Sequence, residues 1–115
     1  MIVCVLDDLL FSVKIKTAAR ALGVDLYVER EAGRVVATVR ERAPSLVILD
    51  LNSTRLRPME AIAALKADPV LASVPTLGYV SHVDTATVAA ARKAGIDEVL
   101  ARSAFAERLG EILRR

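Results

Sequence analysis

Four short apolar runs divide this chain, and each one leads directly into a residue that can do chemistry. The runs and the residues that follow them are Ile2–Leu6 with Asp7 and Asp8, Leu46–Leu49 with Asp50, Thr76–Val80 with Ser81, and Val99–Ala101 with Arg102. Runs of this kind are typical of strands buried on both faces, as in parallel sheets covered by helices. Ligands of such sheets bind beyond the carboxyl ends of the strands. We therefore expect three carboxylates, a hydroxyl and a cation to gather at one edge of the sheet.

Residues with helical spacing separate these runs. Phe11, Ile15, Ala18 and Leu22 recur at the intervals of one helical face, and Gly23 follows them as a C-terminal cap. The same reasoning predicts strands at 26–28 and 98–101 and a helix whose inner face is Ala32, Val36, Val39 and Ala43. It also predicts a helix that starts near Pro58, with Ile62 and Leu65 inside, and a helix over 86–94 that is capped by Asp84 or Thr85. The last predicted helix is capped by Ser103 and has Phe105, Leu109 and Ile112 inside. The alternation predicts one α/β domain over residues 1–115, a doubly wound five-stranded parallel sheet with helices on both faces.

Composition excludes several classes of protein. The 16 lysines and arginines are scattered along the chain and nearly balanced by 14 acidic residues, which argues against nucleic-acid binding. No apolar stretch approaches the roughly 20 residues of a membrane span, and no signal peptide precedes the first strand. The single cysteine, Cys4, cannot form an internal disulfide and is expected in the core. We expect a cytoplasmic protein that contacts neither membrane nor nucleic acid.

The order and separation of these residues resemble those of the receiver domain of bacterial response regulators, a CheY-like fold of the flavodoxin-like group. The resemblance runs from Ile2 to Leu113 and rests on the acidic pair Asp7-Asp8, on the run that ends at Asp50, and on the Ala94-Gly95 step before the fifth strand. It implies a stand-alone receiver domain in two-component phosphorelay signalling, which is a switch rather than an enzyme.

The resemblance also implies how the acidic residues would act. Asp50 would accept a phosphoryl group from a histidine kinase or phosphotransfer protein. Mg²⁺ would be held directly by Asp8 and Asp50, through water by Asp7, and by the backbone carbonyl of Asn52. The residues themselves support a cation more weakly, because three carboxylates at one edge repel each other unless a cation or a proton intervenes. The alternative is that Asp7 and Asp8 merely cap the first helix.

Other positions depart from the receiver pattern. Ser81 would hydrogen-bond the phosphoryl oxygens, but Arg102 stands where the family has a lysine, and it could pair with Asp50, with a phosphoryl group or with solvent. The loop after Asp50 lacks the family's Met-Pro step and carries Arg55 and Arg57. We hypothesise that one of these arginines partly neutralises the carboxylates and weakens the dependence on metal; the alternative is two solvated side chains.

Two interpretations follow from these matches and departures. In the first, phosphorylation of Asp50 changes a surface, and we expect a separate effector protein to read it because we expect no output domain after the last helix. In the second, the chain is a pseudo-receiver, a phosphorylation-independent module for protein binding or dimerisation. Val99 favours the second interpretation, because many receivers carry at this position a Tyr or Phe whose ring rotates inward on activation. A homodimer would use the last two helices, and His82 could titrate at the mouth of the site or be an exposed loop residue.

Overall fold

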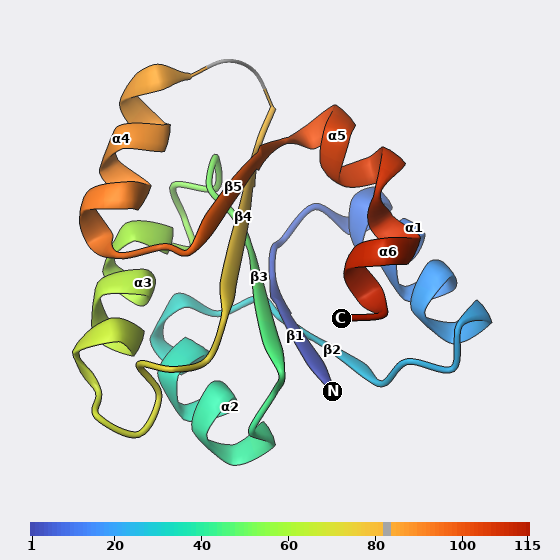
Figure 1. Cartoon of the computed structure of the whole chain (residues 1–115), viewed down its shortest axis with the longest axis horizontal. Helices are drawn as coiled ribbons and strands as arrows, with labels where there is room; N and C mark the ends of the chain where they lie inside the picture. Colours follow the sequence, from blue (N-terminus) through green and yellow to red (C-terminus); the bar gives the residue numbers. More distant parts are fainter. Residues whose placement is uncertain (82–83) are drawn as a thin grey trace.

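A central parallel sheet organises the computed structural model, which describes residues 1–81 and 84–115 (Figure 1). The strand order is β2-β1-β3-β4-β5 and every neighbouring pair is parallel. The strands are β1 (Ile2–Val5), β2 (Leu26–Glu29), β3 (Leu46–Asp50), β4 (Thr76–Val80) and β5 (Glu98–Ala101). The predicted α/β fold is confirmed. Its winding reverses between β1 and β3, where sheets of this type form a crevice at their carboxyl edge.

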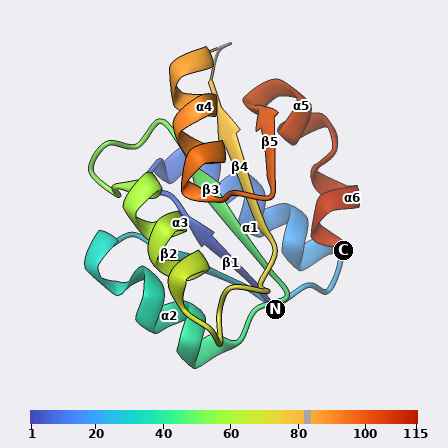
Figure 2. The same cartoon turned by 60° about the vertical axis from the view of Figure 1, so that its left-hand side comes forward.

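Helices cover both faces of the sheet. One face carries α2 (Val35–Arg42), α3 (Pro58–Ala67) and α4 (Thr85–Ala94), and the other carries α1 (Leu9–Ala21), α5 (Arg102–Glu107) and α6 (Leu109–Leu113). The turned view of Figure 2 shows the sheet between these two layers. No helix that the structure describes is both long and apolar enough to cross a membrane.

The cores on the two faces differ in chemistry. The face under α2, α3 and α4 is aliphatic, with Leu49, Ile62 and Leu65 almost fully buried. The opposite face contains an aromatic cluster of Phe11, Tyr79 and Phe105, in which Tyr79 lies 5.2 Å from Phe11 and 4.9 Å from Phe105 between ring centroids. Cys4 is buried on this face as predicted, and burial raises the pKa of its thiol to about 12.

The helix after β2 begins later than its spacing predicts. Residues Ala32–Arg34 form a 3₁₀ turn, η1, and α2 starts only at Val35. The buried residues of α2 are therefore Val35, Thr38 and Val39. The prediction that Ala43 faces inward is wrong, because Ala43 ends the helix in a left-handed conformation (φ 46°) as the chain turns into Pro44.

The predicted last helix is divided in two. Phe105, Leu109 and Ile112 are buried as expected, but the helix breaks at Arg108 between α5 and α6. The prediction that Ser103 caps it is wrong, because α5 begins one residue earlier, at Arg102, without a side-chain cap. In contrast, Asp84 caps α4 as predicted, with its carboxylate accepting from the Thr87 amide.

Gly78 in the middle of β4 allows a close approach between strand and loop. A Cβ atom at this position would lie 2.6 Å from Leu51 Cδ1 and 2.8 Å from Ile96 Cδ1. Both distances are far below van der Waals contact. Glycine at position 78 therefore lets the side chain of Leu51, the residue after Asp50, lie directly against the sheet.

An ion pair joins the amino ends of β4 and β5. The carboxylate of Asp97 accepts from Lys66 Nζ at 2.8 Å, from the Thr76 amide at 2.8 Å and from the Thr76 hydroxyl at 3.0 Å. Lys66 Nζ also donates to the carbonyls of Ala72 and Val74. Burial opposes ionisation of Asp97, but the bonds from Lys66 and Thr76 prevail and lower its pKa.

Candidate functional site

The chemistry-bearing residues meet at the carboxyl edge of the sheet. Asp50 is the last residue of β3, Asp7 and Asp8 follow β1, Ser81 follows β4, and Arg102 opens α5 directly after β5. All of these strands are parallel, so their carboxyl ends share one edge. The predicted gathering of three carboxylates, a hydroxyl and a cation is therefore what the topology produces. We call the three carboxylates of Asp7, Asp8 and Asp50 the acidic rim.

Asp50 is the least compensated carboxylate of the acidic rim. Its Oδ1 accepts a hydrogen bond from the Asn52 amide at 3.0 Å. Burial raises the pKa of Asp50, and the charges of Asp7 and Asp8 raise it further, whereas the Asn52 amide and Arg102 oppose the rise. A carboxylate with a raised pKa holds its charge at a free-energy cost. Such a group is a candidate for chemistry or for binding a cation.

Asp8 is held by two partners. Its Oδ1 accepts from the Phe11 amide at 3.0 Å, so Asp8 caps α1, and its Oδ2 accepts from Arg102 Nη2 at 3.1 Å. The Phe11 amide and the Arg102 guanidinium lower the pKa of this carboxyl against the opposing effect of burial. Asp8 therefore caps α1, and the same residue also forms an ion pair across the rim.

Arg102 lies between this carboxylate and an aromatic ring. Its guanidinium carbon is 4.1 Å from the centroid of the Phe11 ring, a cation–π arrangement. Arg102 therefore pairs with Asp8 rather than with Asp50, and it does not point freely into solvent. The hydroxyl of Tyr79, in the aromatic cluster that includes Phe11, is buried and has no hydrogen-bond partner among the described residues.

Arg55 holds the other member of the acidic pair. Its Nη1 lies 3.2 Å from Asp7 Oδ2, and the Ser53 hydroxyl donates to Asp7 Oδ1 at 3.2 Å. Arg57 instead approaches Glu60 at 3.6 Å. Of the two loop arginines in our hypothesis, Arg55 is the one that reaches the carboxylates.

Ser81 is tied to the loop that follows β3. Its amide and its hydroxyl both donate to Asn52 Oδ1, at 2.6 and 2.9 Å. The sequence predicted a role for the backbone carbonyl of Asn52, but it did not predict this side-chain contact. His82, the next residue, lies outside the described residues.

The donor groups fit a hard divalent cation in their chemistry. Carboxylates and a backbone carbonyl are the oxygen ligands that Mg²⁺ prefers, and Asp7, Asp8, Asp50 and Asn52 supply them. In the described part of the chain, however, no three Asp, Glu, His or Cys side chains stand together as a metal site. Asp7 and Asp8 are instead engaged by Arg55 and Arg102.

Known structures share this architecture. The sequence itself matches no protein-family model and no curated protein. The structure is similar to the receiver domain of NtrX from Brucella abortus, with 21% identity, a TM-score of 0.81 and coverage of 100% of this chain and 96% of that chain. It is similar to chemotaxis response regulator CheY4 of Vibrio cholerae, with 15% identity, a TM-score of 0.84 and coverage of 99% of this chain and 95% of that chain. It is also similar to the receiver domain of a Pseudomonas aeruginosa sensor histidine kinase with magnesium coordinated in its active-site cleft, with 19% identity, a TM-score of 0.85 and coverage of 99% of this chain and 93% of that chain. The chain therefore has the fold of response regulator receiver domains.

Proposed function

We propose that this domain is a phosphoryl-accepting switch of two-component signalling, with Asp50 as the acceptor. The observation that carries the proposal is the raised pKa of Asp50 at the carboxyl end of β3, beside two other carboxylates. An oxygen of Asp50 would attack the phosphorus of a phosphohistidine, forming the P–O bond of an acyl phosphate as the P–N bond to the imidazole breaks. Poor solvation of the Asp50 carboxylate favours this attack.

A divalent cation belongs to the same proposal. Mg²⁺ would neutralise the charge that gathers when a phosphoryl group enters the acidic rim. Asp8 and Asp50 would hold it directly, with Asp7 through water and the Asn52 carbonyl as a further ligand. Ser81 and Arg102 lie at the same edge and would donate hydrogen bonds to the phosphoryl oxygens.

This chain has an exposed apolar surface beside the rim, against which a phosphoryl donor would pack. Leu9, Leu10 and Val13 on the first turns of α1 have exposed fractions of 62%, 84% and 53%. They follow Asp8 directly in the chain. A donor must cover the rim to bring its phosphohistidine to Asp50, and adjoining exposed apolar side chains are typical of protein interaction sites. This patch supports a histidine kinase or phosphotransfer protein as the partner.

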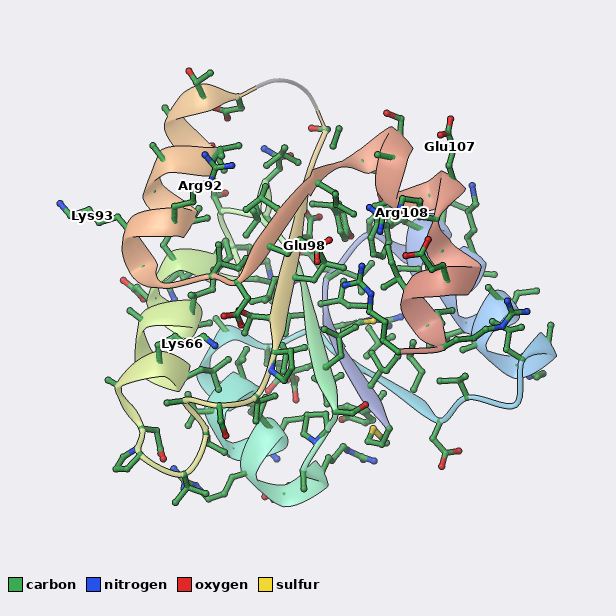
Figure 3. The ribbon with its side chains drawn as sticks, in the orientation of Figure 1. Lys66, Arg92, Lys93, Glu98, Glu107 and Arg108 are labelled. Carbon is green, nitrogen blue, oxygen red and sulfur yellow. The ribbon has the colours of Figure 1, made fainter. Side chains whose placement is uncertain are left out.

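The proposal assigns output to the charged face that α4, β5 and α5 form. Figure 3 shows Arg92 and Lys93 on α4, Glu98 on β5, and Glu107 and Arg108 at the end of α5. Both signs of charge occur on this surface, so a separate effector or a second copy of the chain could pair with it. A homodimer through α4 and α5–α6 is part of the proposal.

The second candidate is a pseudo-receiver that binds partners without phosphorylation. It is favoured by the arginines on Asp7 and Asp8, and by the absence of an aromatic ring at Val99 in β5. In this case the same surfaces would act in a single fixed state.

Intact mass after incubation with acetyl phosphate and Mg²⁺ separates the two candidates. We expect the parent protein to gain one phosphoryl group and Asp50→Ala to gain none. Asp25→Ala, which changes an exposed aspartate at the other end of the sheet, is the matched control and should behave as the parent. A gain that survives in Asp50→Ala would contradict Asp50 as the acceptor. No gain in the parent, with or without metal, would support the pseudo-receiver.

A further inference from the structure

Two arginines of this chain occupy the carboxylates that a divalent cation would use. We propose that Arg102 and Arg55 are built-in counter-ions of the acidic rim and compete with a divalent cation for Asp8 and Asp7. The inference rests on the proposed function, because it concerns the affinity of the same rim for a cation. It assigns to the two arginines a regulation of that site: cation binding requires an arginine to be displaced.

The contact of Arg102 with Asp8 is the stronger restraint. Both carboxylate oxygens of Asp8 are engaged, Oδ1 by the amide of Phe11 and Oδ2 by Arg102. Oδ1 is held at the amino end of α1 by the Phe11 amide, so a cation that approaches Asp8 through Oδ2 meets the positive charge of the guanidinium. Arg102 is further fixed by the Phe11 ring at 4.1 Å, and its side chain is only 37% exposed. A competitor that is held from two sides loses little conformational entropy when it pairs.

Arg55 is the weaker competitor. It contacts Asp7 Oδ2 at 3.2 Å from a loop, and its side chain is 69% exposed. Exposed ion pairs of this kind contribute little, since solvent and salt screen them. The Ser53 hydroxyl on Asp7 Oδ1 nevertheless orients the carboxylate toward the loop.

The charge balance of the rim leads to the same conclusion. The three carboxylates of Asp7, Asp8 and Asp50 would by themselves give a formal charge of −3, and two guanidinium groups reduce it to −1. A divalent cation is attracted less strongly to a net charge of −1 than to −3.

Displacement would also change what Arg102 can do. While it pairs with Asp8, the guanidinium is committed to that carboxylate. Once a cation has taken Asp8 Oδ2, the freed N–H groups of Arg102 can donate to a phosphoryl group on Asp50, in the bidentate geometry that arginine favours.

The test is a titration of the full, unphosphorylated chain with Mn²⁺, read from the electron paramagnetic resonance signal of the free ion. Arg102→Met keeps an unbranched side chain over Phe11 but removes the charge, and we expect it to tighten Mn²⁺ binding by roughly tenfold. Arg55→Ala should tighten it by about two- to threefold, because its pair is exposed. Arg57→Ala is the matched control: it removes a charge from the same loop but from a residue that faces Glu60, and it should leave the affinity unchanged.

Two further variants make the outcomes distinct. Arg102→Lys retains a charge near Asp8 and should bind Mn²⁺ nearly as weakly as the parent, which excludes a general effect of altering position 102. Equal Mn²⁺ affinities in the parent, Arg102→Met and Arg55→Ala would overturn the competition while leaving the cation site in place. Absence of binding in every variant, or binding that persists unchanged in Asp8→Ala, would instead overturn the proposed cation site.

Discussion

Asp50 and Asp97 lie at opposite ends of the same sheet and are compensated in opposite ways. Asp97, at the amino end, accepts three hydrogen bonds from Lys66 and Thr76, and its pKa is lowered. Asp50, at the carboxyl end, accepts one from the Asn52 amide among the described residues, and burial, with a smaller effect of Asp7 and Asp8, raises its pKa. The fold thus compensates Asp97 fully, whereas at the carboxyl end the arginines pair with Asp7 and Asp8 and not with Asp50.

The unfavourable electrostatic free energy of the sheet therefore lies at its carboxyl end, at Asp50. The amino end is a finished structural junction, because β4, β5 and α3 meet there through partners that satisfy one another. The carboxyl end keeps an acid that another charge or group could stabilise. We therefore expect substitutions of the two aspartates to change stability in opposite directions.

Asp97→Ala should give the largest effect, a loss of about 2 kcal/mol in the free energy of unfolding, because it removes the acceptor of the Thr76 amide and the ion pair of Lys66. The measurement is urea unfolding at neutral pH. Asp25→Ala, an exposed aspartate, should change the free energy by less than about 0.5 kcal/mol. Equal losses in both variants would mean that the junction at the amino end is not stabilising.

Asp50→Asn should act in the opposite direction and stabilise the protein at pH 7, by less than about 1 kcal/mol because solvent screens a half-exposed side chain. The Asn52 amide keeps an oxygen acceptor in this variant. A raised pKa in the folded state means that ionised Asp50 destabilises the fold above that pKa, and that the penalty vanishes below its usual value of about 3.9. The gain should therefore shrink as urea unfolding is repeated from pH 7 toward pH 4. A gain that is constant across this range would contradict the assigned cause.

Tyr79→Phe should give the smallest effect, within about 0.5 kcal/mol of the parent or slightly stabilising. The phenol hydroxyl is buried without a described partner, so its removal loses no hydrogen bond and relieves a desolvated group. Urea unfolding again supplies the number. A loss above about 1 kcal/mol would show that this hydroxyl is bonded in solution.

The sequence was sufficient to predict the fold and the location of the acidic rim. Both follow from properties of single strands, since an apolar run that ends at Asp50 or at Asp7 fixes which edge of the sheet its side chain reaches. The order of the elements along the chain then determines that these edges coincide. The cap of α4 at Asp84 was predicted for a similar reason, because it depends on residues only three positions apart.

The partners of the charged side chains were harder to predict. Asp8 and Arg102 are separated by 94 positions, and Lys66 and Asp97 by 31. Their pairing depends on the exact placement of helix ends, which no local pattern encodes. The junction of Lys66, Thr76 and Asp97 was missed entirely for this reason. The buried carboxylate of Glu29 was missed as well; it accepts from the Thr38 hydroxyl and from the amides of Arg30 and Glu31.

Small errors at helix ends had similar causes. Ser103 has the chemistry of a cap, but Arg102 already adopts the first helical position, so Ser103 lies too late in the chain. Ala43 has the spacing of an inner residue, but the following Pro44 requires the helix to end there. In both cases the neighbouring residue, rather than the residue itself, decided the outcome.

The close approach at Gly78 has a consequence for how this sequence can diverge. Leu51 fills the space that a side chain at position 78 would need, and Ile96 limits it from the other side. A homologue could therefore acquire alanine at position 78 only if the side chains at positions 51 and 96 both make room, so these three positions should covary. Because position 51 adjoins Asp50, a change of sequence in β4 would require a change in the loop that shapes the acidic rim.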